Sequence, residues 1–204
     1  MRTRIIMDYV RACSGKILHV GCADPDCEMD SSAWLHAHIH AVVEDRLVGV
    51  DLDIPRVREM LKAGYNVVCY DQADVWSFEN QFDLVIAGEM IEHVPDQEGM
   101  VSELANCLSP GGILLISTPN PFAFTHAVWH WLSGKEHHGN EHVLWQSPKT
   151  LANLLMRHKM KINKTYYCFY GFKSRKWRWL FLSLFEMWPY CRQTILYEIR
   201  REGT

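Results

Sequence analysis

Short apolar runs alternate with helix-patterned stretches along residues 16–117, and each run is followed by polar or small residues. The runs lie at residues 16–20, 46–50, 66–70, 82–87 and 113–117. Runs of this length that are apolar throughout are typical of strands buried on both faces. Amphipathic stretches predict helices at residues 31–43, 54–63 and 97–107.

Strands that alternate with helices form right-handed βαβ crossovers. The sequence therefore predicts an α/β fold: a single Rossmann-like, doubly wound and mostly parallel sheet with helices on both faces. In the helix at 31–43, we expect the buried stripe to contain Trp34, Leu35, Ile39 and Val42. The sequence Ser-Pro-Gly-Gly at residues 109–112 is expected to stop the third helix.

The C-terminal part follows a different pattern. Ser147 is expected to cap a helix that begins at Pro148. Residues 161–170 and 194–200 alternate well enough to form a C-terminal antiparallel hairpin. We expect a single domain over residues 1–204.

Two segments of that domain stand apart from the strand and helix pattern. Residues 119–146 are rich in Pro, His and Trp and are expected to cover the active site. Residues 173–190 form a Trp-rich insertion between the two hairpin strands.

Composition excludes several classes of protein. The 204 residues carry a net charge of -3, with 48% hydrophobic and 22% charged residues, which is ordinary for a globular chain and gives no support for binding long nucleic acid. Seven cysteines without a CxxC pair favour reduced thiols and a cytoplasmic location. We expect no signal peptide. The apolar stretch at 177–188 is too short to span a bilayer and is expected to pack on the core, with contact at a membrane surface as the alternative.

The residues that follow the predicted strands form a chemical pattern. In an open parallel sheet, ligands bind beyond the carboxyl ends of the strands. Those ends are followed by Gly21, Cys22 and Ala23, by Asp51 and Leu52, by Asp71, Gln72 and Ala73, and by Gly88 and Glu89. A carboxylate after the second strand can accept both hydroxyls of a ribose. The alternative is that Asp51 and Asp71 only cap their own loops.

The sequence of the loop after the first strand excludes two classes of ligand. It lacks the G-x-G-x-x-G pattern of dinucleotide sites and the Gly-Lys-Ser/Thr of nucleotide triphosphate sites. Acidic residues around it would repel a phosphate. The sequence therefore favours a ligand with a ribose and a positive charge but without a pyrophosphate.

These motifs together resemble the class I S-adenosylmethionine-dependent methyltransferases. The matching segments are residues 19–23, 49–51, 70–73, 82–85 and 108–112. The resemblance implies S-adenosylmethionine as cofactor, bound by Gly21, Cys22, Ala23, Asp51, Leu52, Asp71, Gln72, Ala73 and Gly88. The chain departs from the family at His19, where an acid is usual, and at Ala23 and Pro25, where glycines are usual.

An acid–histidine patch, Glu89, Glu92 and His93, follows the fourth predicted strand. In a helix these three side chains would share one face. They could hold a divalent metal ion, or a carboxylate could tune the histidine as a base. The alternative is that the two acids cap a helix and His93 packs behind them.

The Glu-x-x-Glu-His-Val segment also resembles that of the ubiquinone-biosynthesis O-methyltransferases, which implies a metal-assisted site. We expect His93 or Glu92 to handle the proton of the methyl acceptor.

Other histidines were weighed as ligands. His36 and His40 share a helix face but have no evident third ligand, so a packed or solvated role is expected. His137, His138 and His142 lie in the expected cover, and their spacing fits no common zinc pattern. For His142, contact with the substrate is the favoured role.

The cover and the insertion also carry aromatic and basic residues. The aromatic residues of the cover include Phe122, Phe124, Trp129, Trp131 and Trp145, which are expected to exclude water or to anchor the cover. The basic residues of the insertion are Lys173, Arg175, Lys176 and Arg178. They would meet a phosphate on a lipid or sugar carrier, or form a solvated face.

The sequence thus predicts a methyltransferase that acts on an oxygen of a small-molecule, glycan or lipid-linked acceptor. The alternative is a catalytically inactive methyltransferase-like module that binds the nucleoside or regulates a partner. The identity of the acceptor and the oligomeric state do not follow from the sequence.

Overall fold

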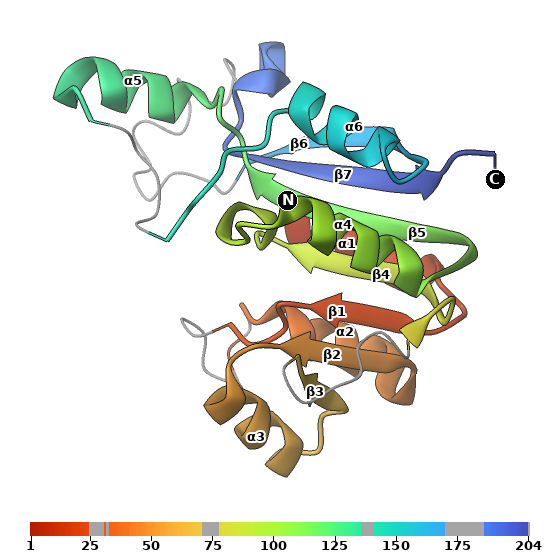
Figure 1. The fold of residues 1–204 in the computed structure, drawn as a ribbon. Coiled ribbons are helices and arrows are strands. Elements are labelled where there is room, and N and C mark those ends of the chain that lie inside the picture. The colour runs from red at the N-terminus through yellow and green to blue at the C-terminus, as the bar shows by residue number, and fades with distance from the viewer. Residues whose placement is uncertain (25–30, 32, 71–77, 136–140, 170–185, 204) are drawn as a thin grey trace.

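The computed structural model describes residues 1–204 except 25–30, 32, 71–77, 136–140, 170–185 and 204. In this part of the chain, seven strands form one sheet in the order β3-β2-β1-β4-β5-β7-β6 (Figure 1). The strands are β1 (Ile17–Val20), β2 (Leu47–Asp51), β3 (Val67–Cys69), β4 (Phe82–Gly88), β5 (Leu108–Pro119), β6 (Met160–Cys168) and β7 (Thr194–Arg201). β1 to β5 are parallel, whereas β7 runs antiparallel to both β5 and β6. The predicted parallel sheet and C-terminal hairpin are confirmed.

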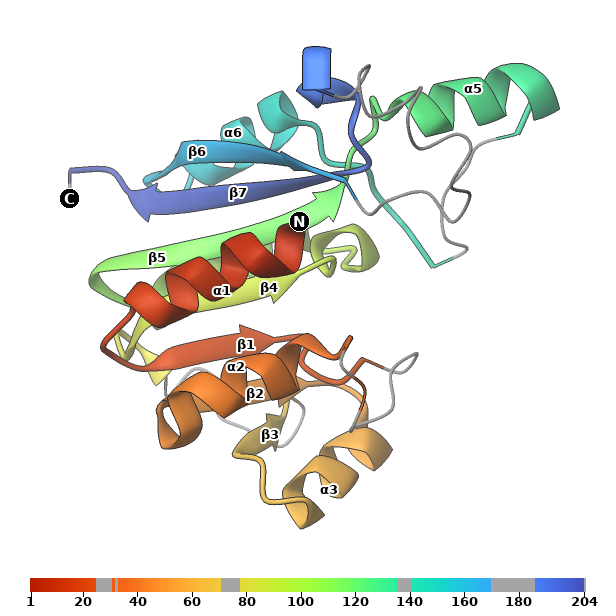
Figure 2. The same ribbon diagram turned by 180° about the vertical axis from the view of Figure 1, so that it is seen from behind.

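Helices cover both faces of the sheet, as expected. On one face lie α4 (Gln97–Cys107) and α6 (Pro148–Met156), and on the other lie α1 (Arg2–Ala12) and α2 (Leu35–Val43) (Figures 1 and 2). α3 (Ile54–Lys62) packs beside α2 at the β3 edge. Each face has its own apolar core because the buried strands project apolar side chains alternately to either side.

Side-chain caps fix where three of these helices begin. Asp53 accepts a hydrogen bond from the Arg56 amide at 3.0 Å, and Asp96 accepts one from the Gly99 amide at 2.9 Å. Ser147 and Thr150 form a reciprocal capping box ahead of α6, which confirms the predicted cap.

The N-terminal helix α1 was missing from the sequence interpretation. Its residues Ile6, Met7 and Val10 are buried against the sheet, a spacing that the sequence does display. The Tyr9 hydroxyl donates a 2.5 Å hydrogen bond to Glu198 of β7. α1 therefore ties the start of the chain to its last strand.

The buried stripe expected for the second helix was wrong by one position. α2 begins after Trp34, which is buried as the residue that precedes the helix, and it buries His36, Ile39 and Val43 while Val42 is exposed. Trp34 and Ile39 are buried as predicted, and the stripe differs because His36, for which a packed or solvated role was expected, lies in the core.

The third predicted helix ends at Cys107, as expected, but the fifth strand begins earlier than the predicted residue 113. β5 starts at Leu108, immediately after α4, and contains the Ser-Pro-Gly-Gly residues. Leu108 pairs with Phe82 and Ile113 pairs with Leu84, so four residues bulge out between these two pairs. Gly111 makes this possible because its φ of +81° is a conformation that favours glycine.

Beyond β5, the expected cover contains α5 (Phe124–Ser133) and leads to α6. Residues 173–185 of the expected insertion lie outside the described residues, and η4 (Pro189–Cys191) follows them. Among the helices that the structure describes, none combines the length and hydrophobicity that a bilayer crossing requires. The single domain over 1–204 stays a prediction.

Two histidines form a buried pair between β1 and α2. The Nδ1 atoms of His19 and His36 lie 3.1 Å apart and the rings stack at an interplanar angle of 16°. Burial lowers the pKa of His36 to about 4 and holds the pKa of His19 well below its usual range. A short contact between two Nδ1 atoms requires one of them to donate and the other to accept, which excludes a pair of two imidazolium rings. Burial also disfavours a single charge on the pair, so the folded pair is neutral near pH 7.

This pair predicts a loss of stability in mild acid. The unfolded chain takes up a proton on each histidine below pH 6.5, whereas folded His36 resists protonation down to about pH 4. The free energy of unfolding should therefore fall as the pH drops from 6.5 to 4, by about 3 kcal/mol from His36. Urea unfolding at a series of pH values measures this slope. His36→Phe should flatten the slope, and His130→Phe, which removes an exposed histidine, should keep it. Equal slopes in wild type and His36→Phe would contradict the assignment.

Candidate active site

The parallel strands end at one edge of the sheet, and the loop after β1 turns there at Gly21. Gly21 has a φ of +70°, and its amide donates to the Val50 carbonyl of β2 at 2.9 Å. A Cβ atom at this position would lie 3.1 Å from the Met90 sulfur. The glycine is required both by its backbone conformation and by the close approach of the segment after β4.

Asp51 at the end of β2 links two loops. One carboxylate oxygen accepts a 2.7 Å hydrogen bond from the Ala23 amide, and the other accepts a 3.0 Å hydrogen bond from the Asp53 amide. The loop-capping role weighed for Asp51 is therefore present. Each carboxylate oxygen keeps a further lone pair, so the same group can also accept hydroxyls from a ligand.

A cavity of about 340 Å³ opens beside this loop. Its volume is within the range of small-molecule sites. Of the residues predicted to bind the cofactor, Gly21, Asp51 and Leu52 line it. Its other lining residues include Met90, His93 and Asp96, which lie between β4 and α4. Tyr70 and Glu103 also line it, and the Tyr70 hydroxyl donates a 2.9 Å hydrogen bond to the Glu103 carboxylate.

The remaining predicted cofactor residues lie elsewhere. The Cys22 carbonyl accepts a 2.9 Å hydrogen bond from the Trp34 indole, and the Ala23 amide is held by Asp51. Gly88 ends β4 next to Ser117 and does not line the cavity. Asp71, Gln72 and Ala73 lie outside the described residues, as does Pro25. His19, which replaces the acid usual in the family, faces His36 in the core and packs beneath the loop after β1.

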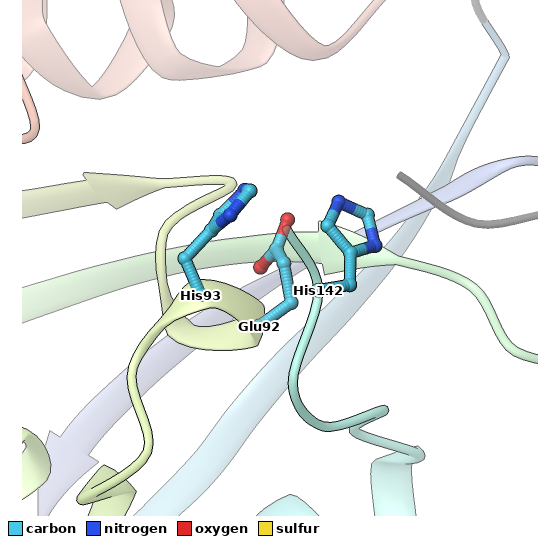
Figure 3. Close-up of side chains that lie close together, drawn as sticks. All are labelled: Glu92, His93 and His142. Atoms are coloured by element: carbon cyan, nitrogen blue, oxygen red, sulfur yellow. The ribbon is translucent and has the colours of Figure 1, made fainter. Parts of the chain in front are cut away.

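Glu92, His93 and His142 form a cluster at the same edge of the sheet (Figure 3). Each offers a ligand atom, and these atoms lie within 4.8 Å of one another. Glu92 stands between the two imidazoles in the close-up. Sequence reasoning named Glu92 and His93 together and proposed a substrate contact for His142, but it did not foresee that the three would meet.

The Glu92 carboxylate is 2% exposed and only half satisfied. Its Oε2 atom accepts a 3.0 Å hydrogen bond from the Thr118 hydroxyl, and its Oε1 atom has no hydrogen-bond partner among the described residues. Burial raises the pKa of Glu92 to about 7, and the neighbouring charge of Glu89 acts in the same direction. A carboxyl group that titrates near neutrality can both take and release a proton.

Backbone hydrogen bonds bring His142 to the cluster. The Val143 and Leu144 amides both donate to the Glu92 carbonyl, at 2.9 and 3.3 Å. The Gln146 amide group donates to Gln97, whose own amide group donates to the Ile91 carbonyl at 2.8 Å. The end of the expected cover is thus attached to the segment after β4. The centre of the His142 ring lies 4.8 Å from the centre of the His93 ring.

The expected helical face through Glu89, Glu92 and His93 was wrong. The segment forms only the short 3-10 helix η3 (Ile91–His93), and Glu89 precedes it with a φ of +53°. Glu89 pairs with Arg2 of α1 at 2.9 Å and accepts a hydrogen bond from Thr194. In the described structure His142, not Glu89, completes the cluster of potential ligand atoms.

Arg2, Thr118 and Thr194 contact the acid–histidine patch and were absent from the sequence interpretation. They come from α1, β5 and β7, and no spacing in the sequence relates them to residues 89–93. Thr118 could have been suspected because it follows an expected strand end.

Comparison with known proteins identifies the family of this chain. A family model described as a methyltransferase domain matches residues 11–160. A ubiquinone biosynthesis O-methyltransferase of Xanthomonas oryzae pv. oryzae is 33% identical over 129 residues, which cover 60% of this chain and 53% of that protein. The chain spans about half the length of the curated relatives it matches.

Solved structures share the fold. An S-adenosylmethionine-dependent methyltransferase from Archaeoglobus fulgidus superposes with a TM-score of 0.67 at 14% identity, over 98% of this chain and 91% of that one. One from Mesorhizobium loti gives a TM-score of 0.60 at 19% identity, over 95% and 96% of the two chains. Because the family model spans most of its length, this chain belongs to the methyltransferase domain family, among the class I S-adenosylmethionine-dependent methyltransferases.

Proposed function

We propose that this chain transfers a methyl group from S-adenosylmethionine to an oxygen of a small-molecule acceptor. The observation that carries the proposal is the half-satisfied, buried Glu92 carboxylate beside His93, which itself lines the cavity bounded by Gly21 and Asp51. The proposed nucleoside-binding cavity thus adjoins Glu92, a group that can accept a proton.

The residues around the cavity fit the donor. Asp51 keeps lone pairs for ribose hydroxyls, and the turn at Gly21 leaves backbone open to the ligand. Three carboxylates line the cavity, from Asp51, Asp96 and Glu103. They favour a positively charged ligand. S-adenosylmethionine, when bound, supplies a reactive methyl group on a positively charged sulfur.

The acceptor side is provided by the Glu92 cluster. When the acceptor oxygen forms its bond to the methyl carbon, the hydroxyl proton leaves, and the carbon–sulfur bond breaks with its electron pair staying on sulfur. Glu92 takes that proton, and His93 and His142 orient the hydroxyl. Holding the acceptor oxygen and the methyl group in line lowers the activation free energy by roughly several kcal/mol, as in intramolecular reactions.

The same three side chains offer one oxygen and two nitrogens, a donor set that suits a divalent transition-metal ion. The unpartnered Oε1 atom of Glu92 also fits a cation. Such an ion, held by Glu92, His93 and His142, would polarise the acceptor hydroxyl. This is the second candidate for how the cluster assists transfer.

The class of acceptor is proposed on the same basis. The named function of the Xanthomonas relative supports an O-methylation, and the aromatic rings of His142 and Trp145 near the cluster suit a flat or ring-shaped acceptor. A glycan or lipid-linked acceptor remains within the proposal. The six cysteines that the structure describes are all free thiols, which supports a cytoplasmic location.

The inactive binding module is the less favoured alternative. It would need the nucleoside seat but no proton acceptor, whereas Glu92 is buried at the site with one oxygen unpartnered. Tight binding of S-adenosylhomocysteine with no transfer to any hydroxylated acceptor would favour it.

Asp51→Asn should weaken cofactor binding. Loss of the carboxylate charge removes one acceptor for the ribose and loosens the Ala23 loop, so the Kd for S-adenosylhomocysteine should rise about tenfold or more. Titration calorimetry measures this change. Asp53→Asn is the control, because Asp53 caps α3 and does not line the cavity. Equal affinity in Asp51→Asn and wild type would remove Asp51 from the site.

Glu92→Gln should slow the chemical step and leave binding alone. Removing a general base costs about 10²-fold or more in rate, while the Kd for S-adenosylhomocysteine should stay within about twofold. Formation of S-adenosylhomocysteine with a panel of small phenols and catechols gives the rate. Glu98→Gln, which changes an exposed acid paired with Arg157, should match wild type. A full rate in Glu92→Gln would refute its role.

Removal of metal distinguishes the two proposed roles of the Glu92 cluster, proton acceptor and metal site. If Glu92 acts as the proton acceptor alone, dialysis against a chelator should leave the transfer rate unchanged. A loss of rate that Mn²⁺ or Zn²⁺ restores, and that His142→Ala reproduces, would assign the cluster to a cation instead.

A further inference from the structure

We propose that α5, together with Met187, Trp188 and Tyr190, docks on the surface of an anionic lipid bilayer. The term docking face is used below for these residues. The inference deepens the proposed function: the contact with lipid stands by itself, and only the delivery of an acceptor from the bilayer rests on methyl transfer at the Glu92 cluster.

The composition of α5 is unusual for an exposed helix. None of its ten residues is buried, yet they include Trp129, Trp131 and Leu132 and no Asp, Glu, Lys or Arg. Trp131 is 84% exposed and Leu132 is 72% exposed. A helix of this composition normally covers a core, and contiguous exposed apolar residues mark a surface that meets something else.

A second segment continues the docking face. Met187, Trp188 and Tyr190 are exposed large side chains, and the Asn120 side chain, before α5, donates to the Tyr190 and Arg192 carbonyls at 2.6 and 2.7 Å. In both views of the fold, α5 and this segment extend beyond the carboxyl ends of the parallel strands (Figures 1 and 2). Trp and Tyr are the residues enriched where proteins meet the interface of a bilayer.

The charge of the neighbouring sequence favours an anionic lipid surface. The sequence from Phe169 to Phe185 contains Lys173, Arg175, Lys176 and Arg178 and no acidic residue. Phe169 directly follows β6. Near the end of β6, the centre of the Tyr167 ring lies 5.5 Å from the centre of the Tyr190 ring. In the sequence, these four basic residues stand between Phe169 and Met187. Basic residues near an anionic bilayer strengthen its attraction for a protein.

The same charge argues against a second copy of the chain as the occupant. Each copy carries four basic and no acidic residues in the sequence between Phe169 and Phe185, so pairing two copies would add like charge to like charge. Like charges oppose that contact, whereas the phosphate groups of an anionic bilayer neutralise them.

The docking face adjoins the Glu92 cluster. The His126 ring of α5 lies 5.2 Å from Trp145, and the Trp145 ring lies 6.5 Å from His142. An acceptor dissolved in the bilayer would therefore reach the cluster without leaving the vicinity of the membrane.

Co-sedimentation with vesicles tests the proposal. The full chain, without acceptor or cofactor, should bind vesicles that mix phosphatidylcholine and phosphatidylglycerol and should bind pure phosphatidylcholine weakly, with high salt releasing it. Trp131→Ser/Leu132→Ser should lower the partition coefficient about tenfold or more. Leu61→Ser/Met156→Ser removes comparable exposed apolar surface from α3 and α6 and should bind like wild type.

Several results would overturn the proposal. These are equal vesicle binding by both double variants and wild type, no binding of wild type to anionic vesicles, or a dimer in sedimentation velocity that only Trp131→Ser/Leu132→Ser dissociates. The last result would assign the face to self-association. Titration of each variant with S-adenosylhomocysteine shows that the fold and cofactor seat are intact. Vesicle binding needs no turnover, so its failure is distinguishable from failure of the proposed methyl transfer.

Discussion

The site depends on the Asp51 carboxylate, which fastens the loop after β1 to the end of β2. It accepts the Ala23 and Asp53 amides, and with Gly21 in a left-handed conformation this fixes the path of the chain beside the cavity. The loop has fewer glycines than the family pattern, so its conformation relies more on such side-chain hydrogen bonds. Underneath, the neutral His19–His36 pair fills the space that Gly49 leaves open, since a Cβ atom there would meet His36 at 2.8 Å. The proposed cofactor site and the packing of α2 are therefore physically connected.

The second constraint is the attachment of the residues before α6 to the segment after β4. The Glu92 carbonyl accepts two amides from this segment, which places His142 next to the Glu92 carboxylate and removes that carboxylate from water. Burial in turn raises the pKa of Glu92 to about 7. One set of backbone hydrogen bonds thus assembles the proposed proton acceptor and tunes it. The same part of the chain leads back to α5, so the proposed lipid contact and the proposed chemistry share one end of the sheet.

Most of the sheet could be predicted because its strands are short, apolar and punctuated by Gly or Asp, and because helix caps such as Ser147 have local signatures. Errors arose where tertiary contacts overruled local pattern. His36 lies in the core, where its Nδ1 atom has a partner in His19, and the Ser-Pro-Gly-Gly turn joins β5 because Phe82 pairs with Leu108. Glu89 lies apart from Glu92 and His93 because it pairs with Arg2. None of these partners is near its counterpart in the sequence.

The sequence by itself determined the alternation of β1 to β5 with α2, α3 and α4, the acidic and glycine residues at the strand ends, and hence the family. Those features are local, because a strand end and its following residue are neighbours in the chain. Only the tertiary structure decided which side chains share the site, since Glu92, His142 and Thr118 come from segments that meet through the sheet and its backbone hydrogen bonds. It also decided that α5 stays exposed, because burial depends on whether the rest of the chain supplies a surface to cover it.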